Sequence, residues 1–93
     1  MDYIKNTKNK NIIAANNMRI GNAVKKGEKY ALFYIKHEGL TREHAVGENI
    51  LNIYLTKPKD IALKVLADVL WLKVDDMEII DYITFDKNGL LIR

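Results

Sequence analysis

Cysteine and serine are both absent from this sequence of 93 residues, and proline occurs only once. Without cysteine the chain can form neither a disulfide nor a thiolate metal site, and without serine it has no serine nucleophile. No stretch approaches the roughly 18 uninterrupted apolar residues of a membrane-spanning helix, and the N-terminus lacks the apolar run of a signal peptide. We therefore expect a single small domain over residues 1–93 that works in the cytoplasm.

The basic side chains are concentrated in the first third of the sequence. The net charge is +3, but residues 1–29 carry seven lysines and arginines against two acidic residues, and acidic side chains are in excess after that. This asymmetry is typical of a protein that meets a polyanion with one face. The alternative is a lysine-rich tail that only keeps the protein soluble. Residues 1–10 are predicted to form a flexible basic arm.

The clearest helix is predicted over Pro58–Leu72. Proline suits the first turn of a helix, and Asp60 lies near the positive end of the helix dipole. Two rows of apolar residues recur at four-residue steps, which indicates a core helix. Trp71 continues these rows, so we expect it in the core, although a tryptophan would also suit a partner-binding site.

The patterns upstream of this helix are mixed. Four features are predicted there: one or two short strands within Ile12–Ile20, turns at Gly21-Asn22 and Lys26-Gly27, a strand or a helix over Tyr30–Ile35, and a helix from about Thr41 to Leu55.

The segment after the core helix allows two interpretations. Asp75 followed by Glu78 has a capping-box pattern, so we predict a helix that ends near Asn88-Gly89 and a strand over Leu90–Ile92. The alternative is a hairpin over residues 77–92 that turns at 86–89. Together with the other elements, the preferred interpretation gives an α+β domain with three or so helices and a short antiparallel sheet.

The C-terminal part of the chain resembles a winged helix-turn-helix DNA-binding domain. Lys59-Asp60-Ile61-Ala62 matches the start of the family's second helix, and Asn88-Gly89-Leu90-Leu91-Ile92 matches its entry to the wing. The N-terminal domains of phage replisome organisers are similar in this stretch, from Thr56 to Arg93. The resemblance implies a small winged helix-like fold with a helix-turn-helix and a wing-like end over residues 56–93.

One feature departs from the family pattern. The helix that would read DNA is acidic, and phosphates repel such a helix. We therefore expect DNA to be contacted by the arm, the basic loops and the wing, through Lys5, Lys8, Lys10, Arg19, Lys25, Lys26, Lys29, Lys87, Asn88 and Arg93. Within these regions the side chains suited to base edges are Asn16, Asn17, Arg19 and Asn88.

The sequence offers no pattern for catalysis. His37 and His44 have no recognised metal spacing, and we expect them to lie half-exposed at the ends of adjoining elements. Acidic side chains that could hold Mg²⁺ are explained more simply by capping and solvation of one helix; these are Asp75, Asp76, Glu78 and Asp81. We expect no metal, no cofactor and no small-molecule substrate.

These observations predict a non-enzymatic, sequence-specific double-stranded DNA-binding protein that acts as a homodimer. The abundance of lysine, asparagine and isoleucine indicates AT-rich coding, which suggests an accessory factor in plasmid or phage replication, transfer or transcription. The alternative is a protein-interaction module, such as a phage inhibitor or an antitoxin-like binder, whose working surface would be the acidic third helix.

Overall fold

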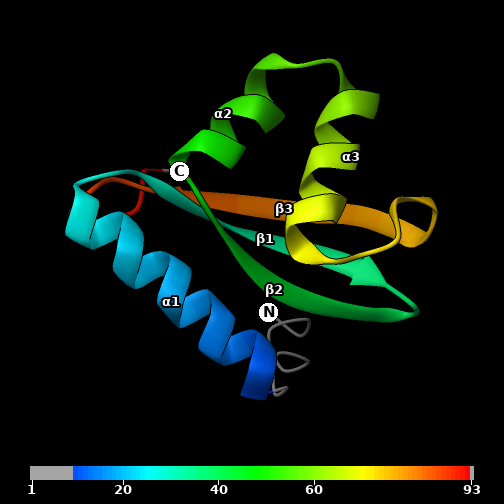
Figure 1. Cartoon of the computed structure of the whole chain (residues 1–93), viewed down its shortest axis with the longest axis horizontal. Coiled ribbons are helices and arrows are strands. Elements are labelled where there is room, and N and C mark those ends of the chain that lie inside the picture. Colours follow the sequence, from blue (N-terminus) through cyan, green and yellow to red (C-terminus); the bar gives the residue numbers. More distant parts are fainter. Residues whose placement is uncertain (1–9, 93) are drawn as a thin grey trace.

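The structure is a computed structural model that describes residues 10–92. Within that range it contains three α-helices, one short 3₁₀ helix and a three-stranded antiparallel sheet (Figure 1), which confirms the predicted α+β class. In chain order the elements are α1 (Lys10–Lys26), β1 (Tyr30–His37), β2 (Leu40–Gly47), α2 (Glu48–Thr56), α3 (Lys59–Leu70), η2 (Val74–Asp76) and β3 (Met77–Phe85). None of the helices in the described range is long and apolar enough to cross a membrane.

The central strand of the sheet is β1, and the strand order is β2-β1-β3. A two-residue turn joins β1 to β2, with Glu38 at φ 53° and Gly39 at φ 78°. Two consecutive positive φ angles are what the hairpin turn of type I′ requires, because its twist matches that of the flanking strands. The segment Tyr30–Ile35, which fitted a strand or a helix, is therefore a strand.

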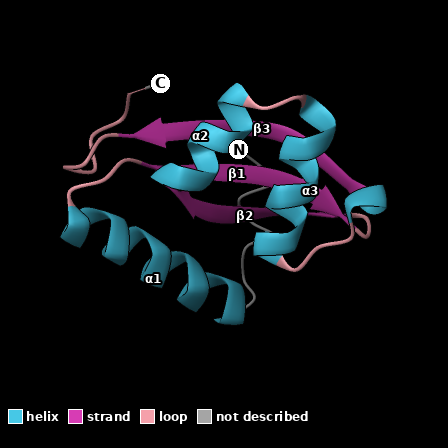
Figure 2. Ribbon diagram, turned by 45° about the horizontal axis from the view of Figure 1, so that its top comes forward, coloured by secondary structure: helices cyan, strands magenta, loops and turns pink. Residues whose placement is uncertain are grey.

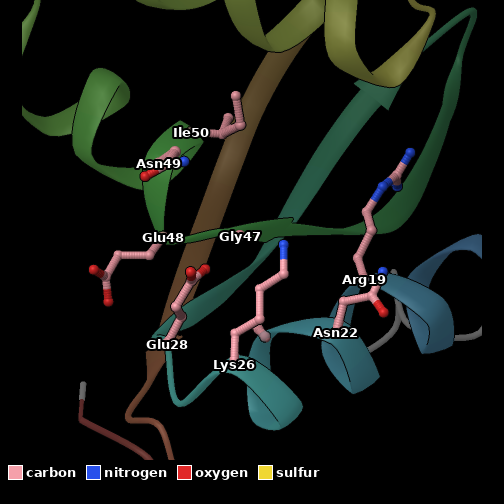
Figure 3. A pocket seen from close by; sticks show the side chains of 9 residues that line it. Arg19, Asn22, Lys26, Glu28, Gly47, Glu48, Asn49 and Ile50 are labelled. Carbon is pink, nitrogen blue, oxygen red and sulfur yellow. The ribbon is translucent and has the colours of Figure 1, made fainter.

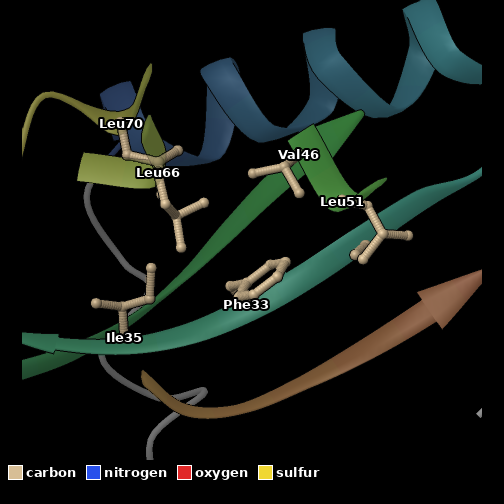
Figure 4. Packing of buried hydrophobic residues seen from close by; sticks show 7 residues of the cluster. Phe33, Ile35, Val46, Leu51, Leu66 and Leu70 are labelled. Carbon is tan, nitrogen blue, oxygen red and sulfur yellow. The ribbon is translucent and has the colours of Figure 1, made fainter. Parts of the chain in front are cut away.

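The helices α2 and α3 cover one face of the sheet (Figures 1 and 2). The core between these helices and the sheet is apolar. Figure 4 shows Phe33 and Ile35 of β1 facing Leu66 of α3. All three side chains are fully buried, and burial of each contributes about 1.5–3 kcal/mol. The predicted core helix is thus confirmed, with Pro58 as its N-cap.

Helix α1 lies beside β2, at the edge of the sheet (Figure 1). The short strands and the turn at Gly21-Asn22 that were predicted within this segment are wrong, because it is one continuous helix. The reason is a long-range interaction. The side chain of Asn16 donates to the carbonyl oxygen of Glu43 at 2.9 Å, and its own oxygen accepts from the N–H of Ala45 at 2.9 Å. Asn16 therefore satisfies the outer edge of β2 as a neighbouring strand would.

The helix predicted from about Thr41 to Leu55 is wrong in its first half. Residues Leu40–Gly47 form β2, whose pairing with β1 buries His44, Ala45 and Val46 in succession. A strand buried on both faces shows no alternation, which makes it resemble a buried helix segment in the sequence. Only the second half, α2, is helical, and Gly47 is its N-cap rather than an interior residue.

The helix predicted over residues 75–88 is also wrong. Only Val74–Asp76 form a helical turn, and Met77–Phe85 form β3, which pairs antiparallel with β1. The chain then reverses through a turn in which the Asp86 carboxylate accepts hydrogen bonds from the N–H groups of Asn88 and Leu90. Phe85 bridges to Leu91. The alternative interpretation, a hairpin over 77–92, is the correct one, and within the described residues 56–92 only the first helix of the expected helix-turn-helix is present.

Candidate nucleic-acid interface

Three chain segments meet at the end of the sheet where β1 begins: the α1–β1 turn, the start of α2 and the turn after β3 (Figure 2). The rings of Tyr30 and Phe85 stack with their centroids 4.9 Å apart. A Cβ on Gly89 would lie 3.6 Å from the Tyr30 hydroxyl. The N–H of Lys29 donates to a carboxylate oxygen of Glu48 at 2.9 Å. We call this region, residues 19–30, 47–50 and 85–89, the basic end.

A cleft of about 300 Å³ opens between α1 and the start of α2 at the basic end. Arg19, Asn22 and Lys26 line it from successive turns of α1, as Figure 3 shows. Glu28 in the α1–β1 turn and Glu48 at the start of α2 also line it. The two glutamates cancel the formal charge of the two cations, so the inside of the cleft does not favour an anion, which would be held at the rim by the neighbouring lysines.

The lysines at the rim of the cleft are well placed to bind an anion. Lys25, Lys26 and Lys29 are all exposed, and Lys25 and Lys26 occupy the last turn of α1. Arg19 is partly buried, and its guanidinium donates to the carbonyl oxygen of Ala45 at 3.4 Å. Burial lowers the pKa of Arg19 from its usual value, but an arginine stays protonated at neutral pH.

The first turn of α2 contributes a second electrostatic element. Its N-cap, Gly47, has no side chain to bond the backbone N–H groups of the turn. Together with Glu48, Asn49 and Ile50 it lines the cleft. The N-terminus of a helix carries a partial positive charge and points its N–H groups outward, which suits a phosphate oxygen.

The structure brings most of the predicted contact residues within the described range to one end. Arg19, Lys25, Lys26 and Lys29 lie around the α1–β1 turn, and the exposed residues Lys87 and Asn88 lie in the turn after β3. Lys10 does not join them, because it starts the 17-residue helix α1 about 24 Å from Lys26. Lys5, Lys8 and Arg93 lie outside the described residues.

Asn16 does not suit base recognition, because it is 4% exposed and both ends of its amide bond to β2. Sequence reasoning missed Asn22, Gly47 and Asn49. Asn22 stands between Arg19 and Lys26 at helical spacing, so a correct helix prediction for α1 would have included it. Gly47 followed by Glu48 is a helix-start signal that the predicted longer helix concealed.

Comparison of the chain with models of known protein families, with curated proteins and with solved structures gives no match. The winged-helix resemblance therefore stays a prediction.

The opposite end of β1 has a different character. Exposed carboxylates gather there on Glu38, Asp75, Asp76 and Glu78. Trp71 follows α3 and is 93% exposed, so its predicted place in the core is wrong. The reason is that the chain turns at Trp71 itself, in the left-handed conformation, which directs the ring away from the apolar rows of α3. We call this region, residues 36–39 and 71–78, the acidic end.

The two histidines are buried, not half-exposed as predicted. His37 ends β1 and is 9% exposed, and its Nε2 accepts from the N–H of Lys73 at 3.0 Å. His44 lies within β2 and is 5% exposed. Burial, with the charges of Arg19 and Arg42, lowers the pKa of His44 to about 4, so it is neutral at physiological pH.

Proposed function

We propose that this protein is a non-enzymatic, cytoplasmic, sequence-specific double-stranded DNA-binding protein. Its DNA-binding surface is the basic end, with phosphates held by Lys25, Lys26 and Lys29 beside the N-terminus of α2. The observation that carries the proposal is the convergence of the α1–β1 turn and the turn after β3, which joins basic residues from both halves of the sequence. Phosphate contacts supply most of the affinity of small DNA-binding proteins.

The proposal divides the work between two kinds of contact. The lysines fix the position of the duplex through its backbone, which carries no sequence information. Asn88 is exposed in the turn after β3, and an asparagine amide can bond an adenine edge with both its donor and its acceptor. Two copies bound to one site would double this small footprint, as expected for an accessory factor of plasmid or phage replication, transfer or transcription.

The test is a salt titration of binding to a fluorescent duplex of about 25 base pairs, followed by anisotropy. The Lys25→Ala/Lys26→Ala/Lys29→Ala variant should bind about 100-fold more weakly than the wild type at low salt. Its slope of log affinity against log salt should be shallower by up to about 2.7, because each lost phosphate contact removes about 0.9.

The matched control removes the same charge elsewhere, in the variant Lys36→Ala/Lys64→Ala/Lys73→Ala. These lysines are equally exposed but lie on the far part of β1, on α3 and in the loop after it. The control should bind like the wild type. If wild-type affinity does not fall with rising salt, or if both variants lose the same affinity, the basic end is not a DNA-binding surface.

One observation favours a second candidate function, a protein-interaction module. Trp71 is the only tryptophan in the sequence, and it is almost fully exposed at the C-terminus of α3. Tryptophan is enriched among the residues that dominate binding at protein interfaces. Under this function the Trp71→Ala variant would lose its protein partner and the triple lysine variant would keep it. Under the first function, the Trp71→Ala variant should keep DNA binding and the triple lysine variant should lose it.

A further inference from the structure

Helix α1 contacts the sheet with one side and exposes the opposite side to solvent (Figure 1). Asn16 and Ala23 are seven residues apart, which places them on the same side of a helix, and they are only 4% and 3% exposed. Between residues 14 and 25 the side chains on the opposite side are all exposed. They are Ala14, Asn17, Met18, Gly21, Asn22 and Lys25. We call this set the outer face of α1.

The composition of the outer face does not favour the helix itself. Glycine and asparagine form helices less readily than alanine, lysine or glutamate, yet Asn17, Gly21 and Asn22 lie here. Gly21 is not among the glycines with a positive φ, and a Cβ on it would meet nothing within 4 Å. Neither the backbone nor packing therefore requires glycine at this position. Met18 is 68% exposed. Residues that oppose the local structure without a packing reason are typical of functional surfaces.

The charge of α1 suits a polyanion. None of its 17 residues is acidic, although the sequence contains 12 acidic residues. The phosphates that border a DNA groove repel carboxylates, so a helix that enters the groove is expected to lack them. Lys25 and Lys26 occupy the last turn of α1, and Asn22 also lines the cleft of the basic end. The outer face is therefore continuous with the basic end.

The dimensions of α1 suit the major groove of duplex DNA. A helix of 17 residues is about 25 Å long and about 10–12 Å wide with its side chains. The major groove of B-form DNA is about 12 Å wide and admits one α-helix. At 3.6 residues per turn, Gly21 and Met18 lie between Asn17 and Asn22 around the helix axis. The lack of a side chain at Gly21 allows the backbone to come close to the base edges between the two amides.

We propose that α1 is the recognition helix of this protein and that its outer face lies in the major groove of double-stranded DNA, at a site rich in A·T pairs. The inference rests on the proposed function. Asn17 and Asn22 each bond an adenine at N6 and N7, and Met18 contacts a thymine methyl group. Arg19 is of the type that reads guanine, but its guanidinium donates to the carbonyl oxygen of Ala45 instead.

The experiment begins with a library of duplexes that contain about 20 randomised base pairs, two turns of DNA, from which the full chain selects its preferred site. Anisotropy then measures the affinity for the selected duplex and for a scrambled duplex of the same composition. The wild type should prefer the selected duplex by at least about 100-fold. The selected sites should be rich in A·T pairs.

Removal of one amide should weaken only the specific complex. Asn17→Ala and Asn22→Ala should each lower the affinity for the selected duplex by about 10- to 100-fold, because one bidentate contact to a base is lost. Their affinity for the scrambled duplex should equal that of the wild type. Asn52→Ala is the matched control, since Asn52 is an exposed asparagine of α2 outside the basic end. It should change neither affinity.

Gly21→Leu separates a role in binding from a role in folding. Leucine is a better helix former than glycine and has open space at this position, so the Tm of the variant should be unchanged or higher. The same side chain should keep the helix away from the base edges and abolish the preference for the selected duplex.

A modified duplex tests the groove directly. Replacing adenine by 7-deaza-adenine in the selected duplex removes only the N7 acceptor of the major groove. This change should weaken the binding of the wild type, and it should have no further effect on the Asn17→Ala/Asn22→Ala variant.

The proposal is overturned if the wild type does not distinguish the two duplexes, if the asparagine variants keep the wild-type preference, or if 7-deaza-adenine has no effect. It is also overturned if Gly21→Leu changes the sedimentation of the protein alone and not its DNA binding, because the outer face would then bind a second copy. The triple lysine variant separates this failure from failure of the proposed function. If that variant weakens binding to both duplexes while the asparagine variants keep the preference, the basic end binds DNA and α1 does not read it. If the wild type binds no duplex, both proposals fail.

Discussion

The basic and acidic ends of the sheet differ in how they fill left-handed backbone positions. At the basic end the chain turns at Gly27 and Gly89, which adopt positive φ angles without steric cost. At the acidic end Gly39 has the same role, but Glu38 and Trp71 also adopt φ angles of 53° and 59°. Each of these side chains costs about 1–2 kcal/mol relative to an unstrained backbone.

Strain that is kept at a solvent-exposed position indicates that the side chain is needed there for something other than folding. At the basic end the turns are relaxed, and the charged side chains they carry project freely. At the acidic end the strained residues are the exposed Glu38 and the exposed Trp71. The comparison therefore supports a separate role for the acidic end, and four measurements can break or sharpen it.

The largest effect on the free energy of unfolding is expected from His44, in the middle of the sheet that both ends share. The pKa of His44 falls from 6.5 in the unfolded chain to about 4 in the folded protein, so between these values the unfolded state binds more protons. The stabilising effect of neutral His44 is complete above about pH 6.5 and is lost as the pH falls to about 4. The loss should amount to about 3 kcal/mol, measured by urea denaturation.

The variant His44→Gln should show a much flatter dependence across the same pH range. If it loses as much stability as the wild type, His44 is not the source of the acid sensitivity.

The next largest effect on the free energy of unfolding is expected where α1 attaches to the sheet. This helix contributes Arg19, Lys25 and Lys26 to the basic end. Asn16→Ala should cost about 2–3 kcal/mol, because it leaves the N–H of Ala45 and the carbonyl of Glu43 without their partner. Asn17→Ala, at an exposed neighbouring position, should change the free energy of unfolding by less than about 0.5 kcal/mol. Equal effects would show that the Asn16 clamp does not hold α1 in place.

The relaxed turns of the basic end should not tolerate a side chain. Gly27→Ala should cost about 1–2 kcal/mol, because alanine is strained at φ 69°. Gly21→Ala is the matched control within α1, where a Cβ would meet nothing within 4 Å. It should stabilise the protein by up to about 1 kcal/mol through helix propensity. If Gly27→Ala leaves the free energy of unfolding unchanged, the two ends do not differ in backbone strain as described.

The smallest effect, of opposite sign, is expected at the acidic end. Trp71→Gly should stabilise the protein by about 0.5–1 kcal/mol, because glycine relieves the left-handed strain and the exposed ring contributes little burial. Trp71→Ala keeps the strain and should be nearly neutral. If Trp71→Gly is destabilising in urea denaturation, the tryptophan is structural and the case for a binding role weakens.

Local signals in the sequence predicted the parts of the fold that depend on local interactions. The core helix followed from apolar spacing around Leu66, and the turn at Gly27 followed from its glycine. The turn at residues 86–89 had the right local signal but entered only as the alternative to a helix end. The α+β class is confirmed, and the predicted cations of the described α1–β1 and β3 turns do lie at one end.

The errors arose where contacts with residues distant in the sequence decide the secondary structure. Asn16 looks like a turn former because its two partners lie 27 and 29 residues away. Met77–Phe85 has enough isoleucine for a helix face or a strand, and only pairing with β1 selects the strand. The exposure of Trp71 and the burial of His37 depend on where α3 ends and on how the loop after it meets β1, which no window of the sequence contains.

The clamp formed by Asn16 also limits how the molecule can assemble. With the middle of the β2 edge already occupied, an incoming strand from another chain has only the part of the β3 edge that Leu91 and Ile92 leave uncovered to join. In a pair formed there, the β3 edge of one copy would pair with the β3 edge of the other. Each copy would then have no free edge left for a third. Sheet-to-sheet association of this protein would therefore stop at a pair and could not propagate into a fibre.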